Sequence, residues 1–205
     1  MAELVSLIYL ALFACSGLGI ARLLFYRERP LRRVWLGLVF GFAMLLWFPA
    51  LFSFAMEFVL RAQLFALALA VAIGGVCWSF SRKKSQTVSP LKNELPILLA
   101  GGILFVFCLV LLSSHTIVEK DGALYVGQST YGDLAMHLGF ISSIAVQGKF
   151  PPMYSICPDK PVCYPFLSES VGATFYLFGT SLRFATMLTA AYAFYTQKHI
   201  VQKWM

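Results

Sequence analysis

Four long apolar runs constrain this chain more than any other feature of its sequence. They lie at about residues 4–25, 34–55, 62–80 and 95–112. Runs of 18 or more apolar residues are typical of transmembrane helices. Only 12% of the residues are charged, about half the share found in soluble domains. The sequence therefore predicts an all-α polytopic membrane protein whose first partner is the lipid bilayer.

A fifth apolar run at about residues 182–195 brings the expected number of transmembrane helices to about five. The region before it, residues 113–180, is a long polar interruption of the apolar pattern. We therefore divide the chain in two. Residues 1–94 hold three transmembrane helices and a basic loop. Residues 95–205 hold the fourth helix, the long loop and the fifth helix.

The long loop itself has local structure. Asp121-Gly122 predicts a hairpin turn. An amphipathic helix of about 16 residues begins near Tyr131, with apolar residues at helical spacing on one face, and ends before Gly148. A second short helix opens at Tyr164-Pro165. Both helices are too short to span a bilayer, so we expect them to lie along its surface.

The net charge of +7 indicates topology rather than a nucleic-acid partner, because the basic residues flank the apolar runs. Membrane proteins place Lys and Arg in this way on the cytoplasmic side. We therefore expect the N-terminus and the 113–180 loop outside the cell (plasma) membrane. The basic residues that carry this argument are Arg22, Arg27, Arg29, Arg32, Arg33, Arg82, Lys83 and Lys84.

Two of the five cysteines lie in the long loop. Cys157 and Cys163 bracket the sequence CPDKPVC. Three interpretations remain open: a short disulfide in an oxidising compartment, two free thiols, and metal ligands. No CxxC pair or nearby His pair completes a ligand set for zinc.

Asp133 and His137 are the main candidates for chemistry in the loop. Residues four apart share a face of a helix. A carboxylate there can act as a general base, or hold a divalent metal ion, the one cofactor that we consider. The alternative is structural, because Thr130 and Asp133 fit a capping box in which Asp133 is the third helical residue.

The order of motifs in this loop resembles a known superfamily. Gly132-Asp133 precedes Gly-x-Phe-Pro-Pro, then Tyr164-Pro165-Phe166-Leu167, then Phe178-Gly179-Thr180-Ser181-Leu182-Arg183. Across roughly residues 95–200, this order is similar to the first external loop of GT-C-type membrane glycosyltransferases, which include protein mannosyltransferases and aminoarabinose transferases.

The resemblance implies an enzyme that moves a sugar from a polyprenyl-phosphate carrier to an acceptor on the outer face. It places the catalytic carboxylate, and the metal ligand if there is one, on Asp133. Candidate substrate-binding residues, including the sources of a cation for the lipid phosphate, are His137, Lys149, Tyr164, Glu169 and Arg183.

Enzymes of this superfamily are much longer, so the resemblance implies that these 205 residues correspond to an N-terminal portion only. A truncated product and a short relative that needs a membrane partner subunit are the other interpretations. The main functional alternative is a non-enzymatic membrane subunit of a lipid or polysaccharide transport system. A third is a small structural membrane protein whose Asp133 only caps a helix.

Overall fold

The structure, a computed structural model, describes residues 1–88, 90–126, 132–157 and 159–202. Among these residues, four helical segments are long and apolar enough to cross a membrane. Each overlaps one of the four apolar runs, so the prediction of a mostly helical membrane protein is confirmed. The segments are α1 (Ala2–Leu24), α2 (Pro30–Met56), α3 (Leu60–Ser81), and Glu94–Thr116, which joins most of α4 (Leu91–Leu111) to the π-helical turn η1 (Leu112–Thr116).

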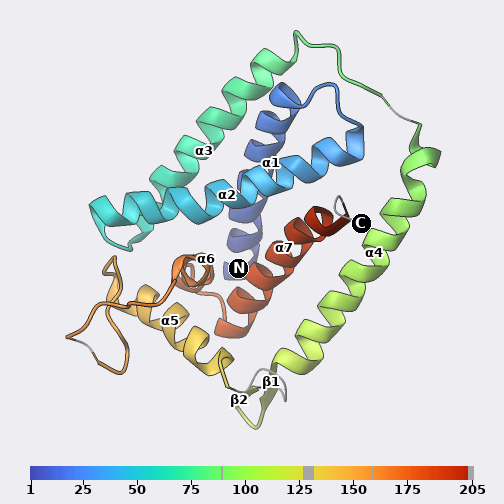
Figure 1. Ribbon diagram of the computed structural model, residues 1–205. Coiled ribbons are helices and arrows are strands. Elements are labelled where there is room, and N and C mark those ends of the chain that lie inside the picture. Colours follow the sequence, from blue (N-terminus) through green and yellow to red (C-terminus); the bar gives the residue numbers. More distant parts are fainter. Residues whose placement is uncertain (89, 127–131, 158, 203–205) are drawn as a thin grey trace.

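Helix α1 packs against both α2 and α3 through glycines (Figure 1). A Cβ atom on Gly17 would collide with the carbonyl oxygen of Gly37 and would lie 2.8 Å from the Cα of Gly41. A Cβ atom on Gly74 would lie 2.5 Å from the Cα of Ser16. Membrane helices gain little from hydrophobic burial against each other, so such close backbone approach is a main source of their association.

The predicted hairpin is confirmed. β1 (Ile117–Lys120) and β2 (Ala123–Val126) pair antiparallel, with Lys120 opposite Ala123. The two residues between the strands both have positive φ, 53° at Asp121 and 76° at Gly122. This is the requirement of a type I′ turn, and it explains why the Asp-Gly pair signals the hairpin.

The two short helices of the loop are α5 (Leu134–Gln147) and α6 (Leu167–Leu177). Gly148 ends α5 in the left-handed conformation, as expected. The start of α5 differs from the prediction, because Asp133 is its N-cap residue rather than its third helical residue. The apolar face of α5 is covered by protein: Leu138 and Ile141 are buried, and Ile141 packs against Gly172 of α6.

A buried polar network joins this loop to the helical bundle. The side-chain oxygen of Gln63 in α3 accepts a hydrogen bond from Thr174 of α6 at 3.1 Å, and its backbone carbonyl accepts one from Tyr9 of α1 at 3.2 Å. Its amide nitrogen lies 3.4 Å from the hydroxyl of Ser53 in α2. Such bonds are the polar contacts that hold helices together in lipid, so α6 is part of the bundle.

The last helix, α7 (Leu182–Gln202), lies between the bundle and α4 (Figure 1). Tyr192 donates a hydrogen bond to the carbonyl of Leu38 at 3.0 Å. On the other side, the rings of Tyr195 and Phe105 meet at 5.6 Å. The prediction for this region gave a fifth span, but α7 is not among the four segments that meet the length and hydropathy requirements.

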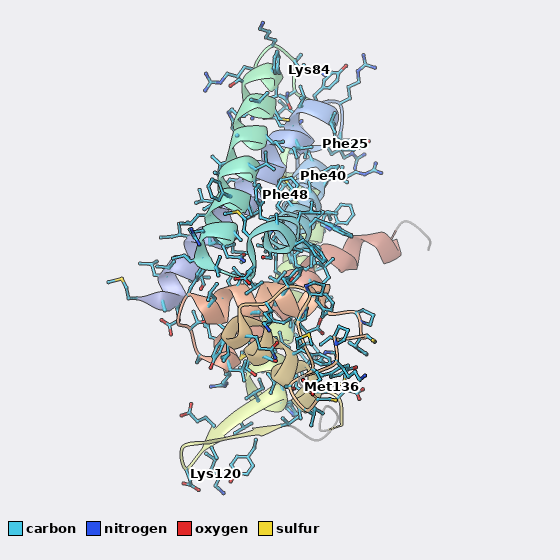
Figure 2. All side chains as sticks on the ribbon, turned by 90° about the vertical axis from the view of Figure 1, so that its left-hand side faces the viewer. Phe25, Phe40, Phe48, Lys84, Lys120 and Met136 are labelled. Carbon is cyan, nitrogen blue, oxygen red and sulfur yellow. The ribbon has the colours of Figure 1, made fainter. Side chains whose placement is uncertain are left out.

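The molecule has two distinct ends. In Figure 2, Lys84 lies at one end and Lys120 of the hairpin at the other. We call these the basic end, formed by the α1–α2 and α3–α4 connections, and the hairpin end. Met136 of α5 lies toward the hairpin end (Figure 2). The basic loops and the polar loop are therefore separated by the length of the helices.

Candidate functional site

The centre of the candidate site is a hydrogen bond between α5 and α6. The Nδ1 atom of His137 lies 2.6 Å from Oε1 of Glu169. Glu169 is only 6% exposed, and its second carboxylate oxygen accepts a hydrogen bond from Ser168 at 2.7 Å. Each carboxylate oxygen of Glu169 thus accepts a hydrogen bond within the protein, and we infer that this buried residue supports His137.

The carboxylate sets the hydrogen-bonding state of the His137 ring. An ionised carboxylate only accepts hydrogen bonds, so Nδ1 of His137 must carry the hydrogen. The nitrogen left for a ligand is then Nε2, which accepts a hydrogen bond in the neutral ring and donates one in the charged ring. A half-buried imidazole with one nitrogen bonded and the other without a partner among the described residues is suited to bind an anion or to transfer a proton.

A cluster of aromatic side chains adjoins the imidazole on one side. The ring of Tyr164 meets that of His137 edge-on, with centroids 5.8 Å apart. Phe140, one turn after His137, packs against Tyr164 at 5.6 Å and against Tyr154 at 5.9 Å. Tyr164 is 38% exposed, so its ring forms part of an accessible apolar wall. The predicted site residues His137, Tyr164 and Glu169 are thus brought together.

Asp133 is exposed at the start of α5, one turn before His137. Its carbonyl oxygen accepts a hydrogen bond from the amide of His137 at 3.1 Å. The carboxylate of Asp133 makes no capping hydrogen bond, so the half of the predicted capping box that Asp133 would supply is not formed. Thr130, the other residue of that box, lies outside the described residues. The carboxylate is exposed and, within the described residues, makes no hydrogen bond, so it can interact with a ligand.

The predicted divalent metal ion would have Asp133 as its protein ligand, and it stays a prediction. Within the described ranges, no group of three or more His, Cys, Asp and Glu side chains comes together. Asp133 would be a single ligand, because Glu169 is already bonded to His137 and Ser168. Cys157 and Cys163 are both exposed and free. We therefore assign no chemical step to a metal ion.

Two predicted substrate-binding residues lie elsewhere. Lys149 is exposed beyond the C-terminal end of α5, and the length of that helix, about 21 Å at 1.5 Å per residue, separates it from Asp133. The Nη2 atom of Arg183 donates a hydrogen bond to the carbonyl of Ser113 at 2.9 Å. Arg183 therefore ties the start of α7 to η1. Helix α7, in which Arg183 is the second residue, also contacts α5.

Sequence reasoning missed three residues of the site. Ser168 bonds to Glu169, while Phe140 and Tyr154 complete the aromatic wall. The spacing of Phe140, three residues after His137, could have placed it on the same face. The other two carry no local signal, because their partners are set by the packing of α5 against α6.

Comparisons of this chain with protein-family models, with curated proteins and with solved structures find no match. The functional argument therefore depends on the residues and their geometry.

Glu169→Leu is expected to lower the free energy of unfolding by about 1–3 kcal/mol, because it leaves the half-buried ring of His137 without its charged partner. Glu169→Gln keeps a hydrogen-bond acceptor and should cost less. Thermal unfolding of the purified chain in detergent measures both. The control is Glu119→Gln on the exposed strand β1, which should change stability by less than about 0.5 kcal/mol. Equal effects of Glu169→Leu and Glu119→Gln would contradict the assigned role.

Proposed function

We propose that this chain is a glycosyltransferase-like membrane protein that transfers a sugar from a polyprenyl-phosphate donor to an acceptor on the outer face of the plasma membrane. The observation that carries the proposal is the exposed carboxylate of Asp133, one turn from an imidazole that a buried carboxylate orients. Glycosyl transfer from a lipid phosphate requires a general base beside a group that can bind the phosphate.

The arrangement of the chain supports this proposal. The positive-inside bias assigns the basic end to the cytoplasm, which leaves the hairpin end and the site outside. In this topology α7 is a fifth membrane segment that returns the chain inward. The site lies among apolar helices, so a lipid-borne substrate could reach it from the bilayer.

The proposed reaction is a single displacement. The acceptor hydroxyl oxygen bonds to the anomeric carbon of the sugar while the bond between that carbon and the phosphate oxygen breaks. Asp133 takes the hydroxyl proton, and the electron pair of the broken bond leaves with the polyprenyl phosphate. In this proposal the Nε2 atom of His137 donates a hydrogen bond to that phosphate when the ring is charged, and Arg183 adds a second positive charge. The ring of Tyr164 supplies apolar surface for the sugar.

A crosslinking experiment tests whether the donor binds at this site. A photoreactive polyprenyl-phosphate sugar is irradiated with the full chain in bilayer discs, and labelled peptides are identified by mass spectrometry. Crosslinks are expected in residues 134–147 and 164–177, and an excess of unlabelled donor should abolish them. Tyr164→Ala should reduce this labelling severalfold, since it removes one wall of the site, whereas Tyr125→Ala on the exposed hairpin should leave it unchanged.

Labelling that a photoreactive diacyl phospholipid reproduces at the same positions would refute donor binding. Labelling that is confined to a co-purifying protein would favour the alternative, a non-enzymatic subunit of a transport system.

A further inference from the structure

A shallow groove of about 190 Å³ lies between α1 and α3, and none of its lining residues belongs to the site described above. The backbones of these helices touch at Gly74, which meets Ser16, but the next glycine, Gly75, has no atom within 4 Å of its Cβ position. The contact at Gly74 therefore forms the floor of the groove, and Gly75 leaves it open. The walls are Leu12, Cys15 and Ser16 of α1 and Val71, Gly75 and Trp78 of α3.

The groove faces outward from the bundle. Leu12, Val71 and Trp78 are each between 37% and 43% exposed, and α1 and α3 are both long enough to cross a bilayer. In a membrane the groove is therefore in contact with the hydrocarbon region. An open, apolar depression between two helices of this length is suited to an acyl chain.

The wall residue Trp78 lies under a positive charge at the basic end. The guanidinium carbon of Arg22 is 4.8 Å from the centre of the Trp78 ring. Arg22 follows Cys15 by seven residues, so it lies about 10 Å further along α1. The groove thus ends at the guanidinium group of Arg22, which stacks on the ring of Trp78, one of the wall residues of the groove.

Arg22 differs in its polar contacts from three other basic residues at this end. Arg32 pairs with Glu28, Arg33 donates to the carbonyls of Tyr26 and Thr87, and Lys84 donates to the carbonyl of Leu23. Arg22 is half-buried, and its side chain makes no hydrogen bond or ion pair within the described part of the chain; its Nε atom is buried without a partner. An unneutralised, partly desolvated guanidinium favours an anionic partner.

We propose that this groove binds an anionic glycerophospholipid, with one acyl chain against α1 and α3 and the phosphate at Arg22. Charge complementarity identifies the ligand class, because the apolar groove and the cation lie along one line, as do the tail and the headgroup of a lipid. Under the orientation proposed above, the lipid belongs to the cytoplasmic leaflet, which is rich in anionic lipids. The site is independent of the sugar donor.

Lipid retention tests the proposal. The full chain is reconstituted in vesicles of equimolar phosphatidylglycerol and phosphatidylcholine, extracted in mild detergent, and the retained phospholipids are quantified by mass spectrometry. We expect phosphatidylglycerol to be enriched about fivefold, the selectivity that one cation near the membrane surface provides. Arg22→Gln should bring the ratio close to one. The matched control Arg32→Gln removes the same charge nearby and should leave the enrichment unchanged.

A second pair of variants tests the groove without altering charge. Gly75→Leu places a side chain in open space inside the groove and should lower the amount of both retained lipids by at least half. Gly102→Leu fills open space on α4, away from the groove, and should have no effect. Circular dichroism confirms that each variant is folded. Tail and headgroup binding are thus examined separately.

Three results would overturn the proposal. The first is equal retention of the two lipids by the unsubstituted chain. The second is an equal loss of enrichment in Arg22→Gln and Arg32→Gln, which would indicate a diffuse surface charge. The third is displacement of phosphatidylglycerol by inorganic phosphate, which would indicate a site for the free anion.

Discussion

Asp133→Asn is expected to reduce sugar transfer by at least 100-fold. Asparagine preserves the size of the side chain but cannot take the proton of the acceptor hydroxyl, and general bases typically contribute about 10²–10⁴-fold to the rate. Asp133 makes no capping hydrogen bond, so the substitution should leave the stability of α5 nearly unchanged. The measurement is transfer of a radiolabelled sugar from polyprenyl phosphate by membranes that contain the chain.

Two comparisons make this prediction specific. Donor crosslinking in Asp133→Asn should stay within about twofold of the unsubstituted chain, because binding of the donor does not need the base. Asp159→Asn, which removes another exposed carboxylate of the same loop, should retain full transfer. Full transfer by Asp133→Asn would disprove the catalytic assignment and leave the binding site to be explained in another way.

Gly17→Ala is expected to produce the largest loss of stability, about 3 kcal/mol, which is the upper part of the range for overpacked sites. The added methyl group would meet the backbone of Gly37 and Gly41. Flexible side chains can turn away from such a contact, but a carbonyl oxygen and an amide in a helix cannot. Thermal unfolding in detergent, followed by circular dichroism, measures the change.

The matched substitution Gly102→Ala should raise the free energy of unfolding instead of lowering it. A Cβ atom at Gly102 meets nothing within 4 Å, and alanine is favoured over glycine inside a helix by up to about 1 kcal/mol. If the two variants unfold at the same temperature, α1 and α2 cannot be packed through Gly17 as the structure has them.

The candidate site illustrates what local sequence signals can predict. Asp133 and His137 were identified as a pair because they are one helical turn apart on the same helix. The partner of His137 is 32 residues away, in a helix that is separated from α5 by a long irregular segment. Glu169 was a candidate, but its role as the support of the imidazole follows only from the packing of α5 against α6.

The same reasoning applies to the membrane helices. Arg22 and Trp78 each fit the expected flank of an apolar run, and neither residue indicates that the two stack on each other. Likewise, Gly74 and Gly75 are adjacent in sequence, yet one closes a helix contact and the other leaves a groove. The rotation of α3 about its own axis decides this difference between the two glycines, and that rotation depends on the neighbouring helices.

The sequence by itself determined that this is a membrane protein, the location of its four long apolar helices, and the hairpin at Asp121-Gly122. These features follow from hydropathy and backbone preference, which act over short stretches of chain. Only the tertiary structure decided which apolar faces meet protein, which face lipid, and which polar residues become partners. The physical reason is that lipid tails and protein interiors are both apolar, so a run of Leu, Val and Phe satisfies either environment equally well.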